Sequence, residues 1–181
     1  MTEPSMTDDI RLTQWSDDVE HTVGLRQLLP WDRLSDVCGR AFPALSRALE
    51  DADVRITGPP YARYRDSSEE RFDVEVGFPV KEAVAPGRVT VAVPVGGSLE
   101  TGGLPRGRAV EAVHVGSHGT LPLTYAHMEE WARARGLEPS DQLWEFYEIG
   151  PDTDPDPRTW RTRVFMPVSA PVHETCERDT R

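Results

Sequence analysis

The chain has 181 residues, of which 31 are acidic and 20 basic, so its formal net charge at pH 7 is −11. This charge repels phosphate backbones and anionic lipid head groups, which argues against nucleic acid and membrane surfaces as direct partners. Two cysteines, Cys38 and Cys176, are too few for a disulfide framework. No apolar leader and no apolar run long enough to span a bilayer are present, so we expect a cytoplasmic protein.

Both ends of the sequence are predicted to be mobile tails. Residues 1–17 and 169–181 are rich in charged and small polar residues, and they have little apolar surface to bury. The length between them, residues 18–168, fits a single domain. That domain has three predicted parts: a first half (18–80), a connector (81–106) and a second half (107–168).

The first half is predicted to contain a strand, a helix and two further strands. Val19–Gln27 is expected to form the first strand, and Asp32–Asp51 a helix, because apolar residues recur there at helical spacing. Pro43 lies inside that pattern and should kink or split the helix, since proline lacks the N–H that an inner turn needs. Apolar residues then alternate along Phe72–Val80, as in a strand with one buried face.

The connector is expected to be mostly irregular. Lys81–Arg88 is predicted to form a loop, Val89–Pro94 an extra strand, and the glycine-rich segment Val95–Gly103 a flexible link. Such a segment invites comparison with phosphate-binding loops. It lacks the Lys-Ser/Thr ending and the following helix of those loops, so we do not expect phosphate binding.

The second half repeats the order of the first. Ala109–Val115 is predicted to form a strand, and a turn at residues 116–119 leads into a helix opened by Thr120, with Pro122 in its first turn. Gly136 is expected to end this helix. Three prolines among acidic residues then predict an exposed loop between Gly150 and Arg158.

The two halves also align residue by residue. Residues 41–64 match 124–147 at a constant offset of 83, and residues 72–80 match 160–168 at an offset of 88. Apolar or aromatic character is kept at these pairs: Phe42 and Tyr125, Leu45 and Met128, Leu49 and Ala132, Val54 and Leu137, Tyr61 and Trp144, Tyr64 and Tyr147. We therefore predict an α+β fold of two duplicated β-α-β-β units with an antiparallel sheet, a pseudo-twofold relation and a central cleft between the halves.

Candidate site residues come from the strand positions that do not pack under the helices. In the first half this set includes Glu75, and the matching region of the second half has Arg163 and then Phe165. Glu145, which matches Ala62, is expected to join them in a cleft with aromatic walls. An alternative stays open: the aromatic residues are core, and Glu75 and Arg163 form a structural ion pair.

Several motifs, in order along the chain, resemble the GyrI-like, AraC-type effector-binding family over roughly residues 20–168. In the first half they are Gly58-Pro59-Pro60-Tyr61-Ala62-Arg63-Tyr64 and Phe72–Val80. In the second half they are Gly107-Arg108 to Val115-Gly116, Leu121-Pro122 to Tyr125, Glu130-Trp131, Pro139 to Trp144-Glu145-Phe146-Tyr147, Pro155-Asp156-Pro157, Trp160-Arg161-Thr162 and Pro167-Val168.

The resemblance implies a duplicated β-α-β-β fold whose central cleft binds lipophilic, often cationic, small molecules. In transcription regulators of this type the domain is joined to a helix-turn-helix segment, for which we expect no room in this chain. Stand-alone relatives sequester toxic compounds, inhibit DNA gyrase or hydrolyse strained cyclopropane-containing genotoxins. A protein partner, gyrase or a regulator, stays open, and so does the choice between a monomer and a weak dimer.

Departures from the family pattern affect the expected chemistry. Many members have Glu and Tyr in the last strand where this chain has Arg163 and Phe165, and a turn tyrosine is replaced by His118. Glu145 and Tyr147 are retained. The predicted ligand-binding residues are Phe42, Tyr64, Glu75, His118, Tyr125, Trp144, Glu145, Tyr147, Arg163 and Phe165.

Three functions compete. A receptor or sequestering protein for lipophilic, drug-like molecules is the favoured hypothesis. In a hydrolase, Glu145 would orient water, and Tyr147 or His118 would handle a proton. In a gyrase inhibitor, the acidic surface would mimic nucleic acid. No cofactor and no metal site are predicted, because His114 and His118 lie on a strand and its turn and not on one helical face.

Overall fold

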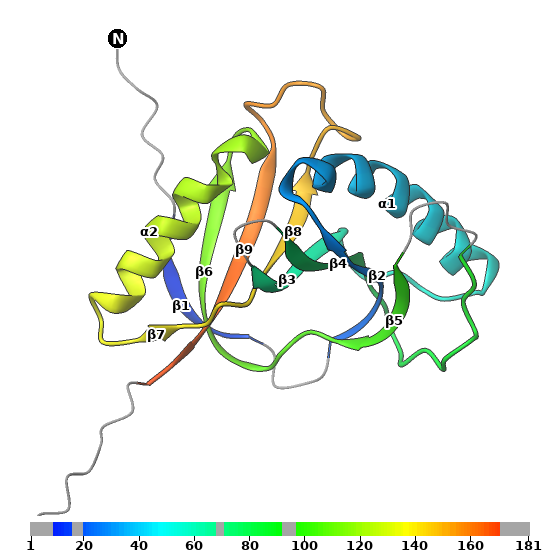
Figure 1. Ribbon diagram of the computed structural model, residues 1–181, viewed down its shortest axis with the longest axis horizontal. Helices are drawn as coiled ribbons and strands as arrows, with labels where there is room; N and C mark the ends of the chain where they lie inside the picture. Colours follow the sequence, from blue (N-terminus) through cyan, green and yellow to red (C-terminus); the bar gives the residue numbers. More distant parts are fainter. Residues whose placement is uncertain (1–8, 16–19, 68–70, 92–96, 171–181) are drawn as a thin grey trace, which may run out of the picture.

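The structure is a computed structural model that describes residues 9–15, 20–67, 71–91 and 97–170. Its elements are two helices packed on a nine-stranded antiparallel sheet (Figure 1), which confirms the α+β class. The strands are β1 (Arg11–Trp15), β2 (His21–Leu29), β3 (Tyr61–Ser67), β4 (Phe72–Pro79), β5 (Ser98–Gly103), β6 (Gly107–Val115), β7 (Glu138–Pro139), β8 (Leu143–Ile149) and β9 (Arg161–Ser169). The helices are α1 (Leu34–Asp51) and α2 (Leu121–Arg133), preceded by the 3-10 turns η1 (Trp31–Arg33) and η2 (His118–Thr120).

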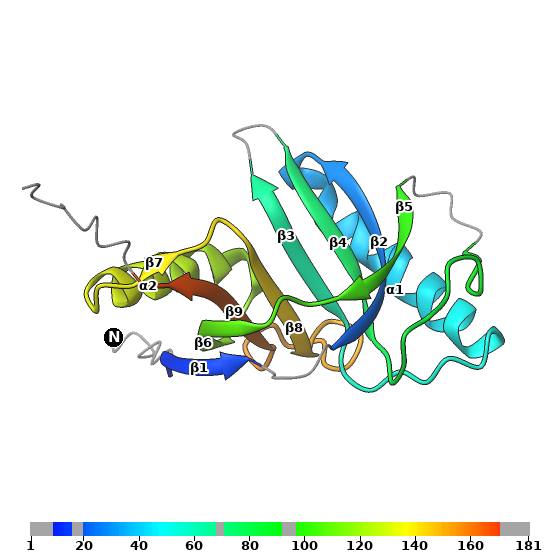
Figure 2. The same ribbon diagram turned by 90° about the horizontal axis from the view of Figure 1, so that it is seen from below.

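The sheet has the strand order β1-β6-β9-β8-β3-β4-β2-β5, with β7 paired to β9. β8 and β3 pair at its centre, so that β9, β6 and β1 follow on one side and β4, β2 and β5 on the other. Figure 2 shows the β6, β9 and β8 half and the β3, β4 and β2 half on opposite sides of the molecule. From the centre outward, β8, β9 and β6 of one half thus have the same order as β3, β4 and β2 of the other.

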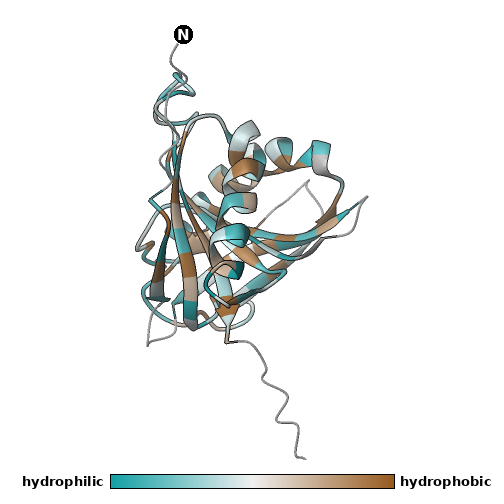
Figure 3. Cartoon of the chain, turned by 90° about the vertical axis from the view of Figure 1, so that its left-hand side faces the viewer, coloured by the Kyte–Doolittle hydropathy of each residue, from teal (hydrophilic) through white to brown (hydrophobic). Residues whose placement is uncertain are grey.

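Both helices cover the same face of the sheet, which we call the helix face. In α1 the buried residues Val37, Ala41, Leu45 and Leu49 recur every four positions and pack over β4 and β2. In α2, Met128 is one of the buried residues that pack over β6. Hydrophobic and hydrophilic bands alternate along the strands (Figure 3), as expected for strands with two different faces.

Pro43 was predicted to kink or split the first helix, and of these the split is wrong, because α1 is continuous through Pro43. It runs from Leu34 to Asp51 with Pro43 inside it. Pro43 is exposed, and so is Gly39, whose carbonyl loses its partner in the helix because proline has no N–H. Water can reach that carbonyl, so the lost hydrogen bond is tolerated.

The two helices end in the same way. Asp53 and Gly136 both have positive φ, 52° and 65°. The residue after each donates its N–H back to the carbonyl five positions earlier, the hydrogen-bond pattern that closes a helix with a left-handed residue. These bonds are Val54 N to Leu49 O (2.9 Å) and Leu137 N to Ala132 O (3.0 Å). The prediction that Gly136 ends the second helix is confirmed.

Two edge strands lie where the sequence predicted none. β1 (Arg11–Trp15) falls in the segment expected to be a mobile tail and pairs with β6. β5 (Ser98–Gly103) falls in the predicted flexible link and pairs with β2. Edge strands need only one partner and keep polar side chains, so their sequences have weak strand signals.

Other boundaries also shift. Residues 89–91 are not in a strand, and the rest of that predicted strand, residues 92–94, lies outside the described residues. β9 extends one residue past the predicted end of the domain, to Ser169. The remaining tail predictions and Cys176 fall outside the described ranges. None of the helices described is long and apolar enough to cross a membrane.

Candidate functional site

The predicted site residues lie on two opposite faces of the sheet. Along β8, Tyr147 packs with the core beneath α1, whereas Trp144 and Phe146 belong to a separate core on the other side, which we call the far face. Glu145 is two residues before Tyr147 and shares its face, because successive side chains of a strand point to opposite sides. Neighbouring residues in the sequence therefore belong to two different environments.

On the helix face, Glu145 is surrounded by three tyrosines that we call, with it, the Glu145 cluster. Its carboxylate accepts hydrogen bonds from the hydroxyls of Tyr147 (2.8 Å), Tyr64 (3.4 Å) and Tyr125. These side chains come from β8, β3 and α2. Glu145 is 0% exposed. In the described part of the chain, no basic side chain forms an ion pair with it.

Burial dominates the electrostatics of this cluster. Loss of hydration raises the pKa of Glu145 from 4.5 to about 7, although hydrogen bonds from Tyr147 and Tyr64 act in the opposite direction. Burial also raises the pKa values of the Tyr64 and Tyr147 hydroxyls. At neutral pH the cluster therefore contains a carboxyl group close to half-ionised and neutral phenol donors.

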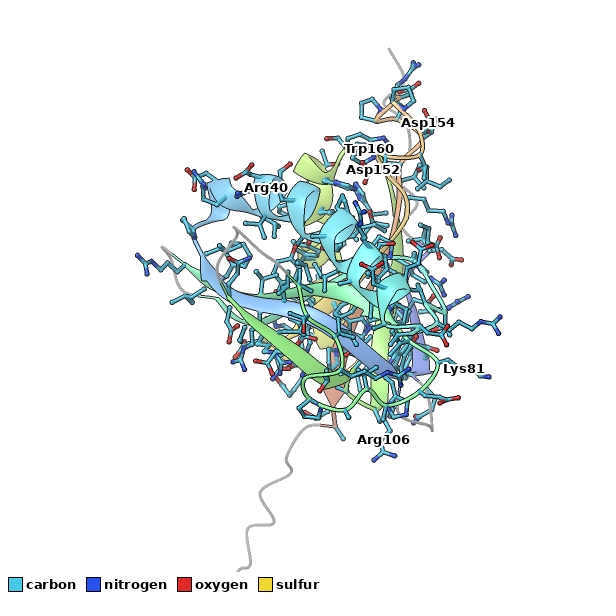
Figure 4. All side chains as sticks on the ribbon, turned by 90° about the vertical axis from the view of Figure 1, so that its right-hand side faces the viewer. Arg40, Lys81, Arg106, Asp152, Asp154 and Trp160 are labelled. Carbon is cyan, nitrogen blue, oxygen red and sulfur yellow. The ribbon has the colours of Figure 1, made fainter. Side chains whose placement is uncertain are left out.

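Two further ring side chains, outside the cluster itself, contact Tyr147. Phe42 of α1 packs against it with 6.0 Å between ring centroids, and His118 of η2 approaches to 5.3 Å. Burial lowers the pKa of His118, which favours the neutral imidazole. The His118 ring also packs against that of Trp160 with 4.7 Å between centroids, and the Trp160 indole donates to the carbonyl of Asp154 (2.8 Å; Figure 4). Trp160 thus connects His118 to the predicted loop before β9.

A groove of about 230 Å³ lies next to the Glu145 cluster. It has an open side, and it shares Tyr64 and Tyr125 with the cluster. The full lining is Tyr64, Tyr125, Glu129, Arg133, Pro139, Ser140, Asp141, Leu143 and Met166. We call it the α2 groove.

The far face contains the other glutamate of the predicted site. Glu75 of β4 is 3% exposed and has two partners on β3: the guanidinium of Arg65 and the hydroxyl of Tyr61. Next to it, Asp73 pairs with Arg26 of β2 at 2.6 Å. The charge of Glu75 is therefore balanced within the fold.

Trp144 and Phe165 also lie on the far face, in an aromatic core completed by Trp15. Their rings stack at 5.8 Å, and the Trp15 ring lies 4.3 Å from that of Phe165. Arg163 is bound on this side too, by Glu148 (Nε to carboxylate, 2.8 Å). The proposed ion pair between Glu75 and Arg163 is therefore wrong, because each has another partner.

The expectation that all ten residues meet in one cleft is also wrong. Phe42, Tyr64, His118, Tyr125, Glu145 and Tyr147 are brought together on the helix face, whereas Glu75, Trp144, Arg163 and Phe165 lie on the far face. The prediction missed Arg65, the partner of Glu75. Its basic side chain lies in β3 among buried residues, and a basic residue in such a strand indicates a buried acidic partner. It also missed Glu129 and Arg133, which follow Tyr125 at helical spacing.

The same region contains two histidines, His114 and His118. Among the residues that the structure describes, no three His, Cys, Asp or Glu side chains gather as a metal site requires. His114 is fully buried and bonds to Thr124 (2.9 Å) and to the carbonyl of Ser117 (3.1 Å), which fixes its ring as part of the α2 packing.

Comparisons with known proteins agree with this architecture. The sequence pattern of the GyrI-like small molecule binding domain matches residues 20–169. The crystal structure of the EcmrR C-terminal domain has a TM-score of 0.68 at 17% identity, covering 92% of this chain and 100% of that one. The structure of SAV2435 bound to tetraphenylphosphonium has a TM-score of 0.58 at 11% identity, covering 88% and 93%.

A third solved structure, a hydrolase from Listeria innocua, has a TM-score of 0.56 at 14% identity and covers 88% of this chain and 91% of that one. At these identities each likeness is one of fold. No curated protein sequence is similar enough to this chain to count as a match.

Proposed function

Because the chain belongs to the GyrI-like small molecule binding domain family, we propose that it binds lipophilic organic cations, with the positive charge held at Glu145. The observation that carries this proposal is a fully buried carboxylate that accepts hydrogen bonds from three phenols and has no cationic partner among the described residues. A buried charge is costly unless an opposite charge pairs with it. A cationic ligand would supply that charge, and its apolar groups would supply most of the binding free energy.

We further infer that the two halves are structural copies related by a pseudo-twofold axis through the Ala62 and Glu145 pair. A shift of 83 positions carries Ala62 onto Glu145, and these two residues are register partners in the β3–β8 pair. The same shift exchanges the two flanking pairs with each other. Those pairs are Tyr61 with Phe146 and Arg63 with Trp144.

The outer strands support the same axis at the offset of 88. Ala62 pairs with Val76 of β4, and Glu145 pairs with Val164 of β9, which is 88 positions after Val76. The register irregularities also correspond, between Tyr64 and Asp66 in β3 and between Tyr147 and Ile149 in β8. The five extra residues in the second half are accommodated in the loop between β8 and β9.

The inferred axis gives Glu145 matching aromatic neighbours on both sides. Tyr64 and Tyr147 correspond under the shift of 83, and both donate to the Glu145 carboxylate. Phe42 of α1 and Tyr125 of α2 correspond in the same way. Aromatic ring faces attract cations, so a cleft at this axis suits an organic cation with aryl groups. Since Glu145 is fully buried, the surrounding aromatic side chains have to separate before a ligand reaches it.

The ligand class is also supported by a protein of the same fold, SAV2435, whose structure is bound to tetraphenylphosphonium. This ion has four aryl groups around one positive charge, which is the combination that the aromatic surroundings of Glu145 would accept. Tetraphenylborate has the same shape and the opposite charge, so the two ions separate the role of charge from the role of apolar surface.

The proposal is tested by isothermal titration calorimetry of both ions with the wild-type protein and the Glu145→Gln variant at pH 8. We expect the wild type to prefer the phosphonium, and the variant to bind it at least about tenfold more weakly, as is typical of a lost charge pair in a desolvated site. Circular dichroism checks that the variant is folded. Equal phosphonium affinity in the two proteins would refute the proposal.

Hydrolysis is a second candidate function. Burial raises the pKa of Glu145 to about 7, which suits a general base, and Tyr147 lies within 2.8 Å. A hydrolase from Listeria innocua has the same fold. In this reading Glu145 orients water, Tyr147 or His118 handles a proton, and strained cyclopropane compounds are the substrates to assay. Product formation that Glu145→Gln abolishes would favour it. Gyrase inhibition stays a prediction from the family resemblance.

A further inference from the structure

The α2 groove has one wall made by a single face of a helix. Tyr125, Glu129 and Arg133 follow one another every four residues along α2, so their side chains lie in one row. The floor includes Leu143 of β8 and Met166 of β9. The opposite wall is the segment from β7 to β8, residues 139–141. One wall of the groove therefore follows the helix, and the rest of the lining includes apolar side chains.

The inner end of the groove is continuous with the Glu145 cluster. Tyr64 and Tyr125 line the groove and also donate hydrogen bonds to Glu145. The two tyrosines thus stand between the groove and the buried carboxylate. A ligand that displaces their hydroxyls from Glu145 gains a direct path from the charge to the groove.

The outer part of the groove has a net negative lining. Glu129 and Asp141 are acidic and Arg133 is basic. Glu129 and Arg133 pair at 2.8 Å, but their side chains are 41% and 61% exposed, so the pair is weak. Such a surface attracts an amphiphilic cation, while the apolar floor accepts its hydrocarbon part.

A matching groove on α1 provides an internal comparison. It has a volume of about 360 Å³ and is lined by Ser46, Glu50, Asp53, Val54, Arg55 and Ile56. The shift of 83 carries Ser46 onto Glu129 and Glu50 onto Arg133. However, the lining of the α1 groove includes neither Phe42 nor Tyr147, so this groove does not reach the Glu145 cluster. Of the two grooves, the one on α2 alone leads to the buried carboxylate.

We propose that the α2 groove is a second subsite of the ligand site and holds the apolar arm of an elongated cation whose charged head lies at Glu145. This inference rests on the proposed function, because the head must first bind at Glu145. It adds a preference that the buried cluster alone does not explain: cations with one extended arm bind more tightly than compact cations with the same head.

The test uses two phosphonium ions with the same head, methyltriphenylphosphonium and hexyltriphenylphosphonium, and a matched pair of variants. Glu129→Trp fills the α2 groove, and Ser46→Trp places the same side chain at the corresponding position of the α1 groove. Affinities are measured by calorimetry at pH 8, and thermal unfolding checks that each variant is folded. The quantity compared is the ratio of the hexyl to the methyl affinity.

We expect the wild type and Ser46→Trp to bind the hexyl ion about tenfold more tightly than the methyl ion, as the burial of a few methylene groups predicts. In Glu129→Trp the two ions should bind within about twofold of each other, because the arm has lost its apolar contacts. The groove proposal is overturned if Glu129→Trp leaves the ratio of the hexyl to the methyl affinity unchanged. It is also overturned if Ser46→Trp lowers this ratio as much as Glu129→Trp does. If neither ion binds the wild type, or Glu145→Gln leaves both affinities unchanged, the proposed function itself fails and the groove proposal fails with it.

Discussion

Glu145 and Glu75 are both buried in the same sheet, but they lie on opposite faces and have different partners. On the far face, Arg65 supplies a positive charge to Glu75 and Tyr61 adds a hydrogen bond. On the helix face, Glu145 has hydroxyl donors and no basic partner in the described chain. The guanidinium neutralises the charge of the first carboxylate within the fold. A carboxylate that accepts hydrogen bonds only from phenols keeps a charge that a cationic ligand could neutralise.

The largest expected effect comes from breaking the pair on the far face. Arg65→Ala should lower the free energy of unfolding by about 3 to 5 kcal/mol, because it leaves Glu75 buried without its ion-pair partner. Urea unfolding at pH 7 measures the loss. Adding Glu75→Gln in the same protein should recover much of it. A loss below about 1 kcal/mol would mean that Arg65 does not neutralise Glu75.

On the helix face, Glu145 should make the stability of the protein depend on pH. The pKa of Glu145 rises from 4.5 to about 7 on folding, so between these values the folded state binds more protons than the unfolded state. The contribution of Glu145 to the free energy of unfolding is therefore fully present below pH 4.5. It decreases by roughly 3 kcal/mol as the pH rises to 7.

The glutamine in the Glu145→Gln variant cannot ionise, so the variant should not lose stability in this way as the pH rises. The measurement is urea unfolding of the wild type and the variant at pH 4.5, 6 and 8. The difference between the two proteins isolates Glu145 from other groups that titrate in this range. We expect the free energy of unfolding of the variant to increase relative to that of the wild type as the pH rises. Parallel pH profiles of the two proteins would contradict the raised pKa of Glu145.

The individual phenols should have smaller effects. Tyr147→Phe removes the 2.8 Å hydrogen bond to Glu145 and should raise the pKa of Glu145 further above 7, with a cost of about 1 kcal/mol at pH 8. Tyr64→Phe removes a longer bond, 3.4 Å, and should shift the pKa less. NMR titration of the labelled Glu145 carboxyl carbon measures both shifts. A larger shift in Tyr64→Phe would reverse the ranking of the two donors.

The smallest effect is expected for Arg163→Glu. Arg163 lies on the far face and is bound by Glu148, so its charge does not face the Glu145 cluster. The preference of the protein for tetraphenylphosphonium over tetraphenylborate should change by less than about 0.5 kcal/mol. Competition calorimetry with the two ions checks this. A marked shift toward the cation would place Arg163 near the ligand and undo the separation of the two faces.

Much of the fold could be predicted from the sequence, because its main elements have strong periodic signals. The α1 and α2 patterns, the strand at Phe72–Val80 and the helix end at Gly136 are local features, and the structure contains all of them. The edge strands β1 and β5 could not be predicted in this way. Apart from Leu12, Trp15 and Leu99 their residues are polar or glycine, and their strand structure depends on pairing with the hydrogen-bonding groups of β6 and β2.

The site was predictable in its residue types but not in its geometry. Glu145, Tyr64 and Tyr147 were identified, and they contact one another. Trp144 and Glu75, which the sequence pattern predicts in the same cleft, lie on the other face. Trp144 is adjacent to Glu145 in a strand, so the two must point to opposite faces. The face of Glu75 depends on its register with β3, where it pairs with Arg63, and that register comes from contacts distant in sequence.

The pairing of Ala62 with Glu145 also limits how many charges the site can neutralise. At the proposed axis one half contributes a carboxylate and the other a methyl group, with both side chains fully buried. A second carboxylate at position 62 would face the first directly, and like charges in that arrangement are destabilising. If the proposed function holds, one equivalent of cation should bind per chain at the proposed axis, and a dication should leave its second charge away from Glu145.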